Sequence, residues 1–374
     1  HAQLSLDECR RLARENYPEI RQYDLVHQTE QYNLSNAARA WIPQLAFSAQ
    51  ATWQTDAPNF PKELTGMLAQ QGLEIPGLRK DQYKVALELN QTIWDGGKSV
   101  ADKRIARAEA AEQKTMTDVD LYELEGRVDD LYFGILLLDE RIAQTNLTLN
   151  LLRSNLEKVR ALQRNGVAMQ SDADVLEAEL LSVGQQLIQF ESSCDSYRRM
   201  LGIFIGQKVG DRKLQHPSAV QPLSGESARP ELAMFAAKID RLTAQEKMVK
   251  SSSMPRLGFF AQGYYGYPGL DYMQSMMNND WSWNAMLGVK LSWNFGAYYT
   301  QKNNLNKLRT SRQQVEVQRD VFLFNMNLQA AQENGDIARL RKAIADDDRI
   351  VALRRSVREA AESKLRNGII DTHD

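Results

Sequence analysis

The residue types that most often carry catalysis or hold metals are sparse in this chain. Its four histidines, at positions 1, 27, 216 and 373, show no metal-ligand spacing and are expected on the solvated surface. Met273, Met276 and Met277 fall in a predicted loop without a nearby Cys or His, so a soft-metal site is not expected there. A complete phosphate-binding loop, a zinc-protease histidine pair and a nucleophile elbow are all absent from the sequence. We therefore predict a protein that is not an enzyme and needs no metal or cofactor.

Charge and cysteine content exclude further classes. The 374 residues carry a formal net charge of −2 with 25% charged residues, which leaves no basic patch for a nucleic-acid backbone. Cys9 and Cys194 are too few and too far apart for a metal cluster or a disulfide framework. A single disulfide between them stays open, although two buried thiols are the simpler expectation.

The sequence also bears on membrane insertion and export. No run of 18 or more apolar residues exists, and the longest apolar stretch lies near residues 133–138, so no transmembrane helix is expected. The first residues, His1, Ala2 and Gln3, resemble the boundary that remains after signal-peptide cleavage. This indicates an exported protein.

The predicted secondary structure changes from strand to helix at residues 89–98. Upstream, apolar and polar residues alternate as in a half-buried strand, and downstream of Gly96 and Gly97 the pattern becomes helical. Residues 77–216 and 269–374 contain no proline, so very long helices are permitted there. A weaker copy of this junction occurs at residues 289–297.

An internal repeat explains the two junctions. Pro18 and Pro230 begin similar motifs 212 positions apart, and Gly166 and Gly368 lie in similar motifs 202 positions apart. The offset changes once, within the polar loop near residues 55–81, because loops absorb length differences that packed elements do not.

The repeat predicts the organisation of the domains. The first structural repeat covers 1–206 and the second covers 229–374, with a Pro-containing linker at 207–228. In the first repeat we expect a helix at 5–40, strands at about 42–54 and 82–95, and long helices at 97–164 and 171–205. In the second we expect a helix at 227–252, strands at about 256–267 and 281–295, and a long helix at 298–366. The final return helix of the second repeat is missing, as though the chain were truncated.

The four predicted strands suit a membrane sheet. Their ten to fourteen residues alternate in hydropathy, as strands that cross an outer membrane do. All six tryptophans lie in these strands or at their edges, where an interfacial aromatic girdle is expected. The proposed girdle residues are Trp53, Trp94, Trp281, Trp283 and Trp293.

Alternation alone equally permits an ordinary sheet with one solvated face. Helices of about 100 Å beside four strands cannot form a compact domain, however. Four strands cannot close a barrel either, and open edges are not tolerated in lipid, so other copies must complete the barrel. Three copies give twelve strands, and two give a narrow barrel of eight.

The long helices show seven-residue spacing of apolar residues. Ile142, Leu149 and Leu156 form one such series, and each has a neighbour three residues later, as in a coiled coil. A turn at Gly166 folds the first pair into an antiparallel hairpin. The alternative reading is a soluble coiled-coil structural or adaptor protein without a membrane pore, which leaves the strands unexplained.

Short motifs in a fixed order then give a family resemblance. The motifs are Leu4-Ser5-Leu6-Asp7-Glu8-Cys9 with Asn16-Tyr17-Pro18-Glu19, Ile42-Pro43-Gln44-Leu45, Ile93-Trp94-Asp95-Gly96-Gly97, Gly166 with Asp172, Leu201-Gly202 to Gly206, Arg229-Pro230-Glu231-Leu232, Met254-Pro255-Arg256-Leu257, and Gly368 with Asp374. Over essentially its whole length the chain resembles the TolC-like outer-membrane efflux proteins. It departs from them in the missing final helix and in Gly296-Ala297, which replaces a second Gly-Gly.

The resemblance implies a mixed α and membrane β fold. It implies a homotrimer with a twelve-stranded β-barrel in the outer-membrane lipid, continuous with a periplasmic α-helical barrel. It also implies a passive exit duct of a tripartite efflux pump or type I secretion system, working with a periplasmic adaptor (membrane fusion) protein and an inner-membrane pump. Cargo would pass from the periplasmic pump assembly to the exterior.

The resemblance also implies site residues at the helical tips. The pore entrance and gate would be formed by Asp374, Asp371, Asp172 and Asp174, although an Asp that begins a helix is often only its N-cap. Adaptor docking would involve Arg164, Asn165, Gly166, Val167, Arg366, Asn367, Gly368 and Ile369.

Overall fold

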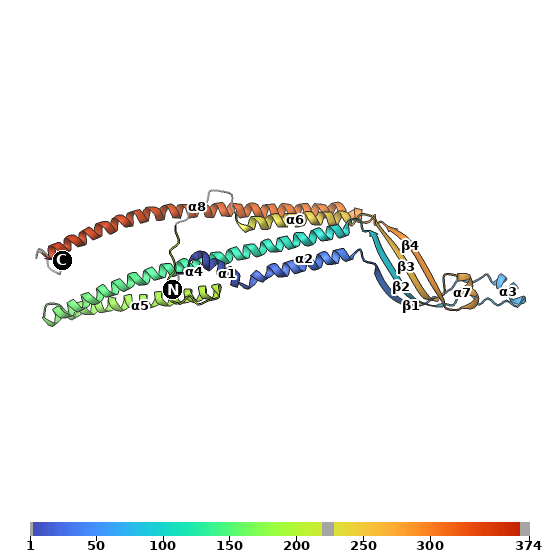
Figure 1. Cartoon of the computed structure of the whole chain (residues 1–374), viewed down its shortest axis with the longest axis horizontal. Coiled ribbons are helices and arrows are strands. Elements are labelled where there is room, and N and C mark those ends of the chain that lie inside the picture. Colours follow the sequence, from blue (N-terminus) through green and yellow to red (C-terminus); the bar gives the residue numbers. More distant parts are fainter. Residues whose placement is uncertain (1–2, 219–227, 367–374) are drawn as a thin grey trace. The chain divides into compact units, whose positions relative to one another are not determined.

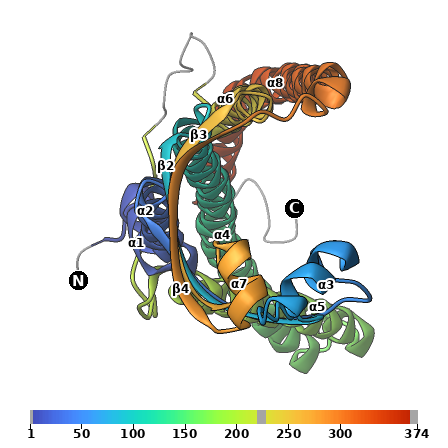
Figure 2. The ribbon, with the colours of Figure 1, turned by 90° about the vertical axis from the view of Figure 1, so that its right-hand side faces the viewer.

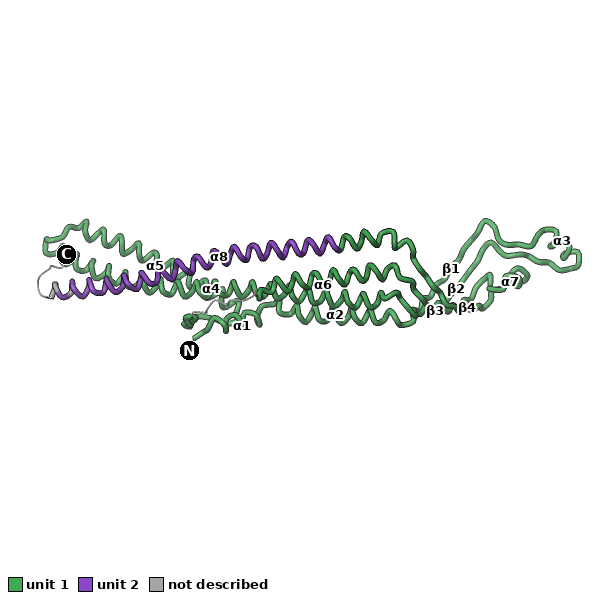
Figure 3. Tube along the Cα trace, turned by 90° about the horizontal axis from the view of Figure 1, so that it is seen from above, with its two compact units in different colours: residues 1–308 green, residues 309–374 purple. Residues whose placement is uncertain are grey.

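The computed structural model describes residues 3–218 and 228–366. Its elements in chain order are α1 (Leu6–Asn16), the 3-10 turn η1 (Pro18–Arg21), α2 (Gln22–Arg39), β1 (Gln44–Trp53), α3 (Lys62–Gln70), β2 (Asp81–Trp94), α4 (Lys98–Arg164), α5 (Gln170–Ile205), α6 (Pro230–Ser251), β3 (Arg256–Tyr267), α7 (Tyr272–Asn278), β4 (Ser282–Ser292) and α8 (Ala297–Arg366). The chain divides into two units, 1–308 and 309–374, and the division falls within α8 (Figure 3).

The first unit is built along the 67-residue helix α4. Figure 1 shows α5 returning beside α4 from one end, while α1, α2 and α6 also run along it. The four strands follow at the opposite end of α4, and the short helices α3 and α7 lie beyond the strands. The second unit consists, in its described part, of the remainder of α8, whose apolar residues such as Val321, Phe324 and Leu328 are exposed.

The strands form one antiparallel sheet in the order β1-β2-β3-β4, so β1 and β4 are its edges. Figure 2 shows that this sheet is curved. The strand bounds differ from those expected from alternation by at most three residues. The division of the chain into two repeats stays a prediction.

Two local details differ from the expected helices and loops. The helix expected at 5–40 is interrupted at Tyr17, whose backbone is extended because the residue before a proline avoids the helical region. Proline can also begin a helix. Pro230 is the first residue of α6, where no backbone amide donor is needed. The predicted loops 55–81 and 268–280 contain the short helices α3 and α7.

The main core of the first unit lies where α1, α4, α5 and the segment after α5 meet. Tyr132 is fully buried there, and its hydroxyl lies 2.8 Å from the carbonyl oxygen of Leu4 and 2.6 Å from that of Gln215. Cys9 and Cys194 are both buried free thiols in this cluster. Burial, followed by the nearby charge of Glu8, raises the pKa of Cys9 to about 12.

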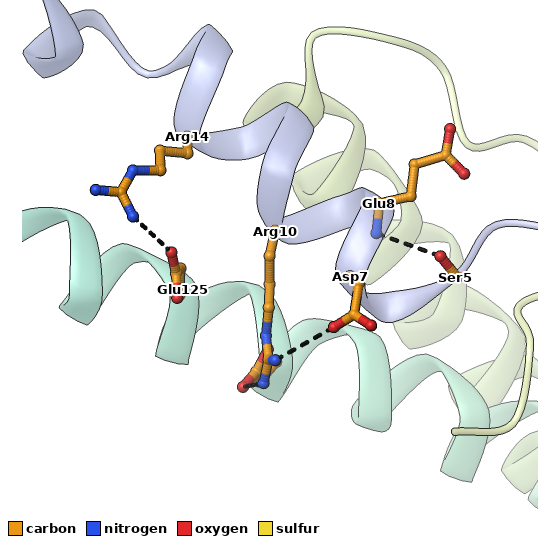
Figure 4. Close-up of polar contacts among 7 residues, drawn as sticks. Ser5, Asp7, Glu8, Arg10, Arg14 and Glu125 are labelled. Atoms are coloured by element: carbon orange, nitrogen blue, oxygen red, sulfur yellow. Dashed lines mark hydrogen bonds and ion pairs between the residues drawn. The ribbon is translucent and has the colours of Figure 1, made fainter. Parts of the chain in front are cut away.

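Charged pairs dock α1 onto α4. The Arg10 guanidinium donates to both carboxylate oxygens of Asp129, at 2.7 and 2.5 Å. Figure 4 shows Arg14 of α1 reaching Glu125 of α4, to which it donates at 3.3 Å. Arg10 also lies 3.5 Å from Asp7 of its own helix. The bidentate pair fixes the register of α1 on α4, because both atoms of each fork must align.

Candidate functional site

The sheet has two chemically different faces. Directly paired residues share a face, so Leu45, Leu89, Ala261 and Leu287 form one row across all four strands. The members of this apolar face are mostly aliphatic, aromatic or small: Leu45, Phe47, Ala49, Ala51, Trp53, Tyr83, Val85, Leu87, Leu89, Leu257, Phe259, Ala261, Gly263, Tyr265, Tyr267, Trp283, Ala285, Leu287, Val289 and Leu291. The polar residues Asp81 and Gln91 lie on the same face, near the two ends of β2. Most of its large side chains are exposed, Phe47 by 72% and Leu287 by 74%, so a broad apolar surface is open to the surroundings.

A β-bulge corrects the alternation at the end of β2. The register of β2 on β3 shifts between Thr92 and Trp94, and Trp94 pairs with Leu257 of the apolar face. Strict alternation would place Trp94 with the polar residues, because its number is even. The extra residue therefore turns this tryptophan to the same face as the aliphatic rows.

Aromatic residues gather at both ends of the apolar face. At the α3 and α7 end, Tyr83 stacks on Trp281 with ring centroids 5.5 Å apart, and Tyr265 lies 5.4 Å from Trp281 and 5.1 Å from Trp283. Trp53 is the last residue of β1 and lies at the same end of the sheet.

At the helix end of the sheet, Trp94 and Trp293 are both exposed. Trp293 lies 4.8 Å from Phe295, and its indole N–H donates to the carbonyl of Ser253 at 3.0 Å. The five tryptophans proposed as a girdle thus fall into two groups that bracket the aliphatic rows.

The opposite face carries a polar network. The Lys84 ammonium donates to the Gln262 side chain at 3.0 Å and lies 4.5 Å from the centre of the Tyr264 ring. Gln262 donates to Glu88 at 3.4 Å, and Asn90 donates to the other Glu88 oxygen at 2.9 Å. Lys84 and Glu88 therefore balance each other's charge through a shared amide.

Asp95 organises the junction between β2 and α4. Its carboxylate accepts the Gly97 amide at 2.9 Å and the Ser99 amide at 2.7 Å, and it also accepts the Ser99 hydroxyl. Burial raises the pKa of Asp95, but the hydrogen bonds from Ser99 and Gly97 outweigh burial and bring the pKa below its usual value. The side chain thus caps the first turn of α4 as a charged group.

The turn between α4 and α5 has a defined geometry. Gly166 has φ of 75°, its amide donates to Gln163 at 2.9 Å, and the Val167 amide donates to Leu162 at 3.0 Å. This pair of bonds is a Schellman motif, which ends a helix with a left-handed residue. Arg164, Asn165, Gly166 and Val167, the proposed docking residues, are all exposed at this turn.

The two acidic residues after this turn have helical partners. The Asp172 carboxylate accepts the Met169 amide at 3.0 Å, so it caps α5. Asp174 accepts the side-chain amide of Gln170 at 2.7 Å. Both side chains are exposed, and the capping role of Asp172 leaves the proposed role at a pore entrance untested.

The corresponding residues of the second repeat are mostly outside the described part of the chain. Helix α8 ends at Arg366. Asn367, Gly368, Ile369, Asp371 and Asp374 lie outside the described residues.

Comparison with known proteins then decides the family. Residues 10–206, more than half of the chain, match the family described as outer membrane efflux protein. The chain belongs to this family. A search of curated proteins found no match.

Solved structures share the fold of this efflux protein at low identity. The outer-membrane channel OprN aligns with a TM-score of 0.70 and 13% identity over 98% of this chain and 81% of its own. The outer membrane protein VceC of Vibrio cholerae gives 0.65 and 16% over 98% and 87%. The CmeC outer membrane channel of Campylobacter jejuni gives 0.63 and 15% over 99% and 78%.

Family membership confirms the predicted resemblance and places this efflux protein in the outer membrane with a periplasmic helical extension. The soluble coiled-coil alternative does not fit this family. No helix within residues 3–218 and 228–366 is long and apolar enough to cross a membrane.

The efflux protein also has polar residues that the sequence alone does not single out. Lys84, Glu88 and Gln262 form the network on the polar face, and Arg256 and Lys290 lie on the same face nearer the helices. Alternation marks Lys84, Glu88, Gln262 and Lys290, since each stands between two apolar-face residues, and Arg256 is the first residue of β3. Only strand pairing brings β2 and β3 together.

Proposed function

We propose that this efflux protein is one subunit of a homotrimeric outer-membrane exit duct. Three copies would combine their sheets into a twelve-stranded β-barrel. The barrel would continue into a periplasmic α-helical barrel, and cargo would pass through it passively. Energy would come from an inner-membrane pump, joined to the duct by a periplasmic adaptor protein in a tripartite efflux pump or a type I secretion system.

One observation carries this proposal: an apolar face bracketed by two aromatic groups belongs to a sheet with two unpaired edges. Unpaired backbone groups on β1 and β4 are unfavourable in lipid, where no water can satisfy them. Pairing β4 of one copy with β1 of the next removes both edges, and a ring of such contacts closes. Twelve strands leave a wider lumen than the eight that two copies supply.

The duct proposal is tested by conductance in planar bilayers. The purified protein should open stable ion-conducting pores, whereas detergent-solubilised protein that inserts without conductance would contradict a duct.

The gate proposal is tested in the same bilayers. We propose that Asp172 and Asp174, with Asp371 and Asp374 of the second repeat, line the periplasmic entrance. Asp172→Asn keeps an oxygen that can cap α5 but removes the charge, so the reversal potential in a salt gradient should show weaker cation selectivity at unchanged thermal stability. Unchanged selectivity would leave Asp172 as a helix cap only.

We further propose that the exposed turn Arg164–Val167 docks the adaptor, together with residues 366–369 of the second repeat. Val167 is 68% exposed at this turn, which supports an apolar contact there. A photo-crosslinking residue at Val167 should capture the adaptor in cells, whereas one at Leu147, which is 72% exposed on α4 several helical turns before this turn, should not. Equal capture at both positions would contradict docking at the turn.

A further inference from the structure

A cavity of about 330 Å³ lies at the helix end of the sheet. It is lined by the end of β2, the first turn of α4, the start of β3 and the end of β4. Most of its strand residues belong to the polar face, among them Asn90, Phe260 and Ser292. The cavity therefore opens on the side of the sheet that is opposite to the apolar rows.

The acidic groups that line this cavity have hydrogen-bond or ion-pair partners in the protein. Asp95 is only 8% exposed and accepts three hydrogen bonds from the first turn of α4. Asp102 is paired with Lys98 at 2.7 Å. Both acidic groups of the lining are thus already neutralised or hydrogen-bonded by neighbours.

Arg256 and Lys290 differ from these acids. Within residues 3–218 and 228–366, no carboxylate lies within ion-pair distance of either side chain. They occupy diagonal positions, because Arg256 pairs with Ser292 and Lys290 pairs with Gly258. Diagonal neighbours on one face of a sheet are about 7–8 Å apart at Cα, within reach of one small ligand.

The cavity also offers an apolar surface. Phe260 is half-buried on the polar face, where nearly all of its neighbours are polar or small. A Cβ atom on Gly288, its cross-strand partner, would meet the Phe260 ring at 3.0 Å. The ring therefore occupies the space that a side chain at position 288 would need. An aromatic ring beside two cations that lack a carboxylate partner among the described residues suits a ligand that is anionic at one end and apolar at the other.

We infer that this cavity, formed around Arg256, Lys290 and Phe260, binds small organic anions with an apolar body, such as aromatic carboxylates. The position on the inner wall of a barrel rests on the proposed function, and the site would then occur three times around the base of the lumen. The duct would favour anionic amphiphiles over cations at this level.

Binding is tested on the detergent-solubilised protein by equilibrium dialysis with naphthalene-1-carboxylate. Neutralising both cations in R256Q/K290Q should weaken binding at least about fivefold, since two exposed charge contacts are lost. The charge-retaining R256K/K290R should bind within about twofold of the original protein. Neutralising two lysines far from the cavity, in K62Q/K208Q, should leave binding unchanged.

The neutral probe 1-naphthylmethanol corrects for uptake by the detergent. It should bind R256Q/K290Q and the original protein equally. Equal binding of naphthalene-1-carboxylate by these two proteins, when both are folded by circular dichroism, would overturn the inference.

Bilayer recordings separate this inference from the duct. If the duct conducts, naphthalene-1-carboxylate should block the current at a concentration at least about fivefold lower in the original protein than in R256Q/K290Q. If no conductance occurs but dialysis shows the charge-dependent binding, the site stands and the duct fails. If conductance occurs without charge-dependent binding or block, the duct stands and the site fails.

Discussion

At the scale of single residues, Asp95 shows how one side chain joins two kinds of structure. It follows the last residue of β2 and caps the first turn of α4 through Gly97 and Ser99. Asp95 directly follows β2, and both amides that its carboxylate accepts belong to the start of α4. These bonds therefore hold the start of the helix against the end of the strand.

The protonation of Asp95 should affect stability at low pH. Its pKa in the folded protein lies below the usual value, so its contribution to stability is present above about pH 4 and is lost as pH falls through the lower folded pKa. We expect Asp95→Ala to lower the free energy of unfolding by about 1 kcal/mol at pH 7. Thermal melts of both proteins should differ less at pH 3 than at pH 7, and a difference that grows on acidification would contradict this assignment.

Gly96 and Gly97 form a matched pair for the same junction. Both have positive φ, 70° and 85°. A Cβ on Gly97 would meet nothing within 4 Å, whereas one on Gly96 would lie 2.7 Å from Cβ of Met254. Gly97→Ala should therefore carry only the backbone penalty of about 1–2 kcal/mol, and Gly96→Ala should add about 1–3 kcal/mol of overpacking. Denaturation midpoints measure the difference, and equal midpoints would show that the approach to Met254 relaxes freely.

The geometry of the junction between β4 and α8 explains why Gly296-Ala297 can replace a Gly-Gly pair there. Helix α8 begins at Ala297 itself, and Gly296 is not in the left-handed region. An alanine is acceptable there because the turn at Asn294–Phe295 does not need a positive φ at that position.

At the scale of elements, the central prediction concerns the faces of the sheet. Leu287 and Met286 are neighbours in the middle of β4 but belong to opposite faces. Leu287→Lys should destabilise membrane assembly by about 2–4 kcal/mol, because a charge would face lipid near its midplane. Met286→Lys is the matched control, since it adds the same charge on the polar face.

The amount of folded, heat-modifiable protein in the outer-membrane fraction measures both variants. We expect the Leu287 variant to be depleted and the Met286 variant to accumulate normally. Depletion of the Met286 variant alone would reverse the assignment of the faces.

The sequence predicts some elements better than others for physical reasons. The strands are predictable because alternation is a local signal, and the long helices because residues 77–216 and 269–374 lack proline. The helices α3 and α7 are not predictable, since nine and seven residues are too few for a clear periodicity. The bulge near Trp94 depends on β3, which is distant in sequence, so no local pattern could reveal it.

The candidate sites divide in the same way. The turn at Gly166 follows from a glycine that ends a long helical pattern, and its Schellman bonds agree with that reading. The proximity of Arg256 and Lys290 depends on the pairing of β3 with β4, which no local sequence pattern shows.

At the scale of the whole molecule, the sheet needs closure. Within the described part of one chain, β1 and β4 are open edges and the apolar face of the sheet is exposed. Family membership places this chain in the outer membrane, where those edges and that face need protein and lipid respectively. The number of copies in the assembly therefore decides how the barrel closes.

Native mass spectrometry of the protein extracted from outer membranes tests that number most directly. We expect a dominant species with the mass of three chains, which dissociates to single chains when the sheet is unfolded. A dominant species of one or two chains, from extracts that retain their strand content by circular dichroism, would contradict it.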